Sequence, residues 1–140
     1  MFGDEAAIRQ RLEGITGCRG VHGMTDYQRK IQAGKQLPAI FVGCEGYTVD
    51  QISGQNKSAL LSVRWLIVVA GRDVSSIIDG KPARDSVAEI SRRAFARLIG
   101  WYPPSGSPMT ALNGYLPMYE SGLVKFPLVF ESKLHIEQEA

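Results

Sequence analysis

The sequence predicts an α+β protein in which helices pack against a mostly antiparallel, mixed sheet, and three stretches carry this prediction. The longest apolar run, Ser58–Gly71, alternates as a central strand does. A second run, Leu123–Ile136, alternates apolar and polar residues, as a strand with one buried face does. Pro82–Ile99 repeats its apolar residues at helical spacing. The 140 residues are 44% apolar, so we expect a single domain, residues 1–140, around one core.

The run SALLSVRWLIVVAG has two different faces. One face is apolar along its whole length: Leu61, Val63, Trp65, Ile67 and Val69. The other begins polar and ends apolar: Ser62, Arg64, Leu66, Val68 and Ala70. We therefore expect its far end to be covered on both sides, by a helix or by another subunit. A buried helix is the competing interpretation, but the β-branched residues favour a strand.

The residues before this strand predict short helices and a strand meander. The expected elements are a helix at Asp4–Glu13, a short strand or extended link at Cys18–Met24, a helix at Tyr27–Ala33, extended pieces at Pro38–Gly43 and Gly46–Ile52, and a polar turn at Ser53–Ser58. Acidic residues in the first turn of the first helix suit the helix dipole.

The residues after the central strand predict a turn, the main helix and two further strands. A turn at Asp79–Gly80 precedes Pro82–Ile99, whose apolar stripe consists of Val87, Ile90, Ala94 and Leu98, widened by Phe95 and Ile99. Leu112–Tyr119 predicts an edge strand interrupted by Pro117. A hairpin at Glu120–Gly122 leads into the last strand, and Glu137–Ala140 is expected to fray. The side chains expected in the core are Trp65, Ile67, Ile90, Leu98, Phe126 and Phe130.

The charge and hydropathy of the chain give no sign of a nucleic-acid-binding or membrane protein. The net charge is +2, and the lysines and arginines form no continuous run. Arg64 interrupts the longest apolar stretch, which is too short to span a bilayer as a helix. The N-terminus lacks the features of a signal peptide. We expect a cytoplasmic protein in which Cys18 and Cys44 are free thiols.

The sequence contains no motif that predicts catalytic, cofactor-binding or metal-binding residues. The two histidines, His22 and His135, do not have the spacing of metal ligands. A zinc site of Cys18, His22 and Cys44 is one interpretation, but a small buried thiol and a surface imidazole form the simpler one. Pairing Cys18 with His22 as nucleophile and base lacks an orienting third group.

Aromatic residues at two places are candidates for contact surfaces. Trp101 and Tyr102 follow the main helix, where they either close the core or serve as interface anchors. Tyr115, Tyr119 and Phe126 surround the last hairpin, where they form either the edge of the core or a contact surface.

Four segments in this order resemble the small tail terminator proteins of Mu-like and lambda-like tailed phages and their prophages. They are PAIFVGCEGY at Pro38–Tyr47, RWLIVVAGRD at Arg64–Asp73, LIGWYPP at Leu98–Pro104 and YESGLVKFPLVFESKL at Tyr119–Leu134. The similarity extends over nearly the whole chain. It implies a tail-terminator-like fold and a structural protein that is not an enzyme and has no cofactor. It also implies a hexameric ring at the head-proximal end of the tail tube, which stops tube polymerisation and offers a surface for head joining.

The partners implied by the resemblance are further copies of the chain, the tail tube protein and the head–tail connector or stopper protein. No membrane and no sequence-specific nucleic acid is implied, although DNA passes through the lumen of such a ring. The protein is then a virion component assembled in the host cytoplasm. Another neck, head–tail connector or tail-completion role is the near alternative. A small enzyme or ligand-binding domain using Cys18, His22, Cys44 or Glu45 is the distant one.

A closed ring requires two different patches on each subunit, which meet head to tail. Besides the loops Ser53–Ser58 and Arg72–Lys81, the candidate interface residues are Lys57, Leu66, Val68, Arg72, Trp101 and Tyr102. Charged residues near these loops are expected to set register and partner choice more than affinity.

Overall fold

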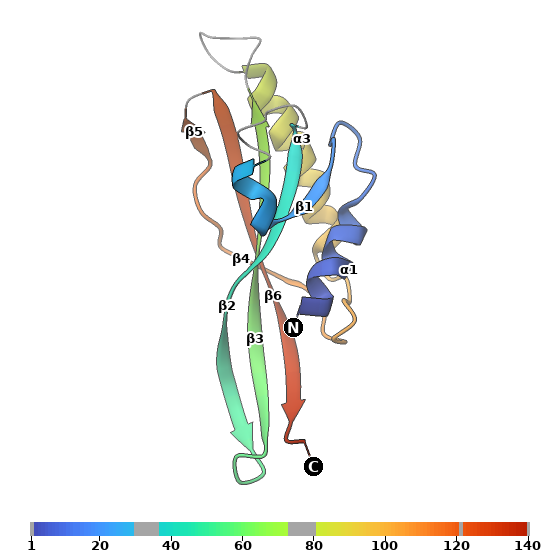
Figure 1. The fold of residues 1–140 in the computed structure, drawn as a ribbon, viewed down its shortest axis with the longest axis vertical. Coiled ribbons are helices and arrows are strands. Elements are labelled where there is room, and N and C mark those ends of the chain that lie inside the picture. Colours follow the sequence, from blue (N-terminus) through green and yellow to red (C-terminus); the bar gives the residue numbers. More distant parts are fainter. Residues whose placement is uncertain (1, 30–36, 73–80, 121, 140) are drawn as a thin grey trace.

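A computed structural model of the chain describes residues 2–29, 37–72, 81–120 and 122–139. Its elements are α1 (Phe2–Leu12), β1 (Val21–Gly23), the 3-10 helix η1 (Met24–Asp26), β2 (Ala39–Ser53), β3 (Ser58–Arg72), α3 (Lys81–Leu98), β4 (Thr110–Leu112), β5 (Met118–Glu120) and β6 (Leu123–Glu137). Within the described ranges, six strands form one mixed sheet with helices packed against it (Figure 1). The expected α+β class is confirmed.

Strand β3 is the centre of the sheet, as its sequence predicts. The strand order is β1-β2-β3-β6-β4, and β5 also pairs with β6. Strands β2 and β6 flank β3 in antiparallel fashion, and among the described strands only β1 and β2 pair in parallel. Trp65 lies opposite both Cys44 and Phe130, so the middle of all three long strands meets there.

Strand β2 is continuous, whereas the sequence predicted two separate pieces. The register with β3 shifts between Cys44 and Gly46 and again between Val49 and Gln51. Each shift is a bulge, which inserts one residue and moves the following side chains to the other face. Because of the bulges, the strand continues through the segment where its alternation is interrupted.

The main core lies between α3 and one face of the sheet. Val87, Ile90, Ala94 and Leu98 are buried there, as the helical stripe predicted. Of the six expected core side chains, five are buried, and Phe126 is half-buried because it lies where β6 has an open edge. The indole Nε1 of Trp65 donates a hydrogen bond of 3.0 Å to Ser132 Oγ, so this buried donor is satisfied.

Among the described residues, the same chain covers the last third of the other face of β3. Val68 and Ala70 form a second cluster with Phe41, and Met24 and Tyr27 pack against it. A Cβ at Gly43 would lie 2.7 Å from Met24 Cβ, so glycine permits η1 to approach the sheet closely. The cover expected on both sides of this end is therefore present, and on this second face η1 and the residue after it contribute to it.

The segment expected as one strand at Leu112–Tyr119 is instead two short strands. Strands β4 and β5 pair with different parts of β6, at 129–131 and at 123–125. Residues 113–117 between them form no strand, and Pro117 lies in this break. The two pairings leave 126–128 of β6 without an outer neighbour among the described strands.

The remaining predicted elements differ from the structure at their first or last residues. Helix α1 begins at Phe2, and the expected helix at Tyr27–Ala33 is helical at 27–29, with its remainder outside the described residues. The turn Asp79–Gly80 and Ser121 of the last hairpin also lie outside them. The expected tail is ordered at its start, because Glu137 belongs to β6 and Gln138 N donates to Lys57 O over 2.7 Å.

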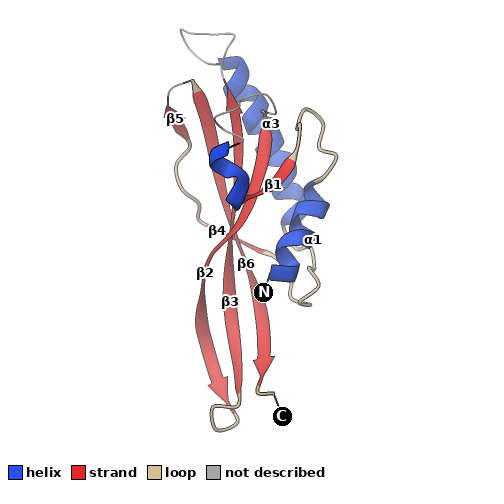
Figure 2. Ribbon diagram, in the orientation of Figure 1, coloured by secondary structure: helices blue, strands red, loops and turns tan. Residues whose placement is uncertain are grey.

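The three long strands extend well beyond the helices (Figure 2). We call this part, residues 46–53 of β2, 58–63 of β3 and 132–137 of β6, the projecting ribbon. Its far end carries the β2–β3 turn and lies near the C-terminus (Figure 1).

Candidate interaction surfaces

The face of the projecting ribbon that continues the main core is apolar and exposed. Tyr47, Val49 and Ile52 lie opposite Val63, Leu61 and Ala59, which puts them on the face that α3 covers higher up. Ile136 joins them from β6, where it lies opposite Ala59. Ile52 is 57% exposed, and Tyr47, Val49 and Ile136 are exposed as well. We call these four residues the ribbon face; an apolar patch of this kind is typical of a protein-interaction surface.

The opposite side of the projecting ribbon is polar and held by a small network. Lys133 Nζ lies 2.8 Å from Asp50 Oδ2 and 3.2 Å from Glu131 Oε1, and Ser62 Oγ donates to Asp50. The hydrogen bond from Lys133, with those from Ser62 and Thr48, lowers the pKa of Asp50 to about 2. The Asp50 hydrogen bond raises the pKa of Lys133. These bonds connect side chains of β2, β3 and β6 on this side, in addition to the backbone pairing of the strands.

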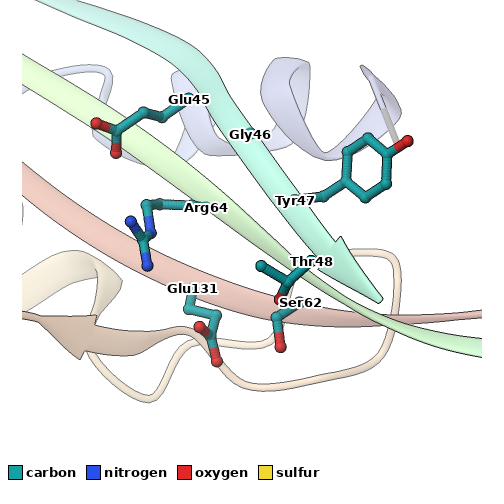
Figure 3. A pocket seen from close by; sticks show the side chains of 7 residues that line it. All are labelled: Glu45, Gly46, Tyr47, Thr48, Ser62, Arg64 and Glu131. Atoms are coloured by element: carbon teal, nitrogen blue, oxygen red, sulfur yellow. The ribbon is translucent and has the colours of Figure 1, made fainter. Parts of the chain in front are cut away.

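A shallow polar pocket lies at the base of the projecting ribbon (Figure 3). It is lined by Glu45, Gly46, Tyr47, Thr48, Ser62, Arg64 and Glu131. Arg64 lies between Glu45 and Glu131, while the Tyr47 ring points away from them (Figure 3). Tyr115 donates a hydrogen bond to Glu45, which raises the pKa of Tyr115 and ties the loop after β4 to β2. Its lining offers charged groups for polar contacts, and neither a thiol nor an imidazole.

A second apolar surface lies between α3 and the open edge of β6. The groove is lined by Ala88, Ser91, Arg92, Phe95, Ala96, Ile99, Phe126 and Leu128. The sequence placed Phe95 and Ile99 on the buried stripe, but Phe95 is partly exposed and Ile99 is 53% exposed. Phe95 packs on the buried Phe130, with ring centroids 5.2 Å apart. Glu89 pairs with Arg92 and with Arg93 at 2.8 and 3.0 Å. We call this surface the α3–β6 groove.

The candidate interface residues on β3 and its turn differ in accessibility. Lys57 is exposed in the turn at the end of the projecting ribbon, and Arg72 is exposed at the other end of β3. Leu66 is half-buried beside the second cluster, and Val68 belongs to that cluster and is 8% exposed. Val68 therefore offers little side-chain surface to a neighbour. The loop at 73–80 lies outside the described residues.

The two aromatic residues after α3 have different environments. Trp101 is half-buried against the main core, and the guanidinium of Arg11 lies 5.8 Å from its ring centroid. Tyr102 is 64% exposed. Both line a shallow hollow beside α1, which also includes Pro104. Trp101 thus closes the core at this corner, while Tyr102 presents contact area to solvent.

The ribbon face and the α3–β6 groove were not predicted as interaction surfaces. The signal for the first was present in the sequence as three apolar residues, Tyr47, Val49 and Ile52, in a segment with interrupted alternation. Recognising it requires the positions of both bulges. The signal for the second was an apolar stripe on α3 wider than a single sheet face covers.

The thiols and imidazoles are spread over the fold. Cys18 Sγ donates to Gly20 O at 3.2 Å, and burial raises the pKa of this thiol. Cys44 is exposed on β2, and the His22 ring packs on Phe41 with centroids 5.6 Å apart. Across the described ranges, no group of three or more His, Cys, Asp or Glu residues is placed to hold a metal ion. In the same ranges, no helix is both long and apolar enough to cross a membrane.

The architecture has known counterparts. A chain of the structure titled "Virion of native gene transfer agent (GTA) particle" has a similar fold, with a TM-score of 0.62 and 14% sequence identity, covering 94% of each chain. No curated protein sequence matches the chain. The profile of the family described as phage tail terminator protein matches residues 1–140. The chain therefore belongs to the phage tail terminator family and is a structural protein of phage tails.

Proposed function

We propose that the chain forms a homohexameric ring at the head-proximal end of the tail tube. The ring stops polymerisation of the tube protein and provides the joining surface for the head connector. Family membership supports the location at the end of the tail tube, and one structural observation supports the ring. The subunit has two different exposed apolar surfaces, the ribbon face and the α3–β6 groove. Two unlike surfaces are what a closed head-to-tail assembly requires of each copy.

The proposed ring meets the tube with one face and the connector with the other. The candidates for these contacts are the exposed residues of the sequence-predicted set, namely Lys57, Arg72 and Tyr102, with smaller contributions from Leu66, Trp101 and Val68. The polar groups around Arg64 are suited to fix how a partner is aligned on the subunit, because charged contacts contribute more to specificity than to affinity. Assembly takes place in the host cytoplasm, and DNA passes through the ring lumen.

We propose a purely structural role with no catalytic step and no cofactor. The geometry supports neither the zinc site of Cys18, His22 and Cys44 nor Cys18 and His22 as nucleophile and base. Cys18 hydrogen-bonds a backbone carbonyl, and the His22 ring packs on Phe41. The near alternative, another neck or connector role in the same assembly, uses the same kind of surfaces. Tail length separates the two roles, because only a terminator limits growth of the tube.

The test is electron microscopy of particles made with and without the chain. Without it, tails should be abnormally long or should fail to join heads. Particles made with Tyr102→Ala or Trp101→Ala should show the same defect if these residues anchor a contact, which typically contributes about 2 kcal/mol or more. The isolated variants must remain folded, and unfolding of Trp101→Ala alone would mark this residue as part of the core. Normal length and normal joining without the chain would refute the terminator role.

A further inference from the structure

We infer that the ribbon face of one copy packs into the α3–β6 groove of the next copy in the ring. The inference rests on the proposed ring and specifies its subunit contact. It places Tyr47, Val49 and Ile52 of one subunit against Phe95 and Ile99 of its neighbour.

The ribbon face continues the apolar face of the sheet beyond the part that α3 covers. Along the same face of the sheet, α3 buries Val69, Ile67 and Trp65, and the apolar side chains then continue past the helices to Ile52. Two bulges keep them on this face, since each corrects the alternation where it would otherwise turn an apolar residue to the polar side. The structure thus builds an apolar surface beyond the reach of its own helices. An exposed surface of this kind is typical of one covered by another protein.

The α3–β6 groove is suited to receive such a surface. It has a volume of about 470 Å³ and is open to solvent along its length. Its floor is preformed, because Phe95 packs on the buried Phe130, and its rim is held by the ion pairs of Glu89 with Arg92 and Arg93. A preformed apolar groove binds without the cost of ordering its own side chains.

The positions of the two surfaces favour a second copy as the occupant. Strands β2 and β6 lie on opposite sides of β3, so the β2 side chains of the ribbon face and the groove at β6 lie toward opposite edges of the sheet. If the ribbon face of each copy binds the groove of the next, both surfaces of every copy are buried. The same contact then repeats around a closed ring.

The contact can be tested by cross-linking within assembled tails. In a Cys44→Ser background, the chain carries both Ile52→Cys and Ile99→Cys, and purified tails are treated with a short bis-maleimide. We expect a ladder from dimers to the complete ring. The matched control replaces Ile52→Cys by Gln51→Cys, which places the thiol on the neighbouring residue and the opposite face of β2. This control should yield less than a tenth of the cross-linked product.

The other outcomes identify other occupants and overturn the inference. Dimers formed by Ile52→Cys alone would show that ribbons pack on one another, and a cross-link from Ile52→Cys to the tube protein would assign the ribbon to the tube. No ladder from the double variant in tails that contain the chain would also refute this contact while leaving the terminator role intact. Absence of the chain from tails would instead refute the proposed function. Unchanged thermal melting of each variant establishes that the fold is preserved.

A mixing experiment provides an independent measurement. Ile52→Asp and Ile99→Asp should each weaken self-association at least 100-fold in analytical ultracentrifugation, whereas Gln51→Asp should change it less than threefold. A mixture of the two defective variants retains one intact ribbon and one intact groove, so it should form one-to-one dimers and nothing larger. Loss of association by only one of the two variants, or a mixture that stays monomeric where the wild type associates, would contradict the inference.

Discussion

Replacing Phe130 by alanine tests both the core and its link to the α3–β6 groove. Phe130 is fully buried, lies opposite Trp65 and Ala111, and supports the Phe95 ring that lines the groove. Loss of a buried phenyl ring combines lost transfer free energy with a cavity, for which the usual cost is about 3–5 kcal/mol. With a urea m value of about 1–3 kcal/mol/M, the midpoint of unfolding should fall by roughly 1–5 M. The melting temperature should fall by about 10–20 °C.

The measurement is urea unfolding followed by far-UV circular dichroism and tryptophan fluorescence. Leu116→Ala is the matched control, because Leu116 is 85% exposed and its truncation should cost less than about 0.5 kcal/mol. A loss below about 1 kcal/mol for Phe130→Ala would show that this side chain is not in a tight core. The packing of β6 against β3 and α3 described above would then be wrong.

Ser132→Ala should reduce the free energy of unfolding by about 1–3 kcal/mol, because it leaves the buried Trp65 N–H without its acceptor; unchanged urea unfolding would show that another acceptor replaces it. The depressed pKa of Asp50 predicts that its contribution to stability is present above its ordinary pKa near 3.8 and is lost as the pH falls toward about 2. Asp50→Asn should flatten the pH dependence of the melting temperature in this window, and equal profiles would contradict this role. A chelator should leave the melting temperature unchanged, whereas a marked fall would revive the proposed zinc site.

The sequence was sufficient for the elements whose pattern follows one period throughout. Strand β3 and helix α3 keep one period along their buried face, and β6 does so with Ser132 as a polar member, so their positions and most of their buried residues could be predicted. Strand β2 could not be predicted as one strand, because each bulge shifts the phase of alternation by one residue. The separation of β4 from β5 depends on where each pairs with β6, which local propensity does not determine.

The interaction surfaces were harder to predict, because their residues are of the same types as core residues. Phe95 and Ile99 fit the helical stripe of α3, but both are exposed beside 126–128 of β6, which has no outer neighbour among the described strands. The sequence pattern likewise predicted Val68 as an interface residue, although Phe41 and the residues around η1 cover it in the fold. Burial by distant segments decides whether an apolar residue forms core or surface, and no local pattern records it.

The two faces of the projecting ribbon are expected to have different roles: the polar side stabilises the ribbon, and the apolar side contacts a partner. The backbone pairing of β2, β3 and β6 builds the ribbon, and hydrogen bonds on the polar side and at the tip, from Lys133 to Asp50 and from Gln138 to Lys57, add to it. The ribbon face contributes little to this framework, since Ile52 is largely exposed. Substitutions on the polar side are therefore expected to change the stability of the ribbon. Substitutions on the apolar side are expected to change association while the subunit remains folded, because a preorganised surface needs no refolding to bind.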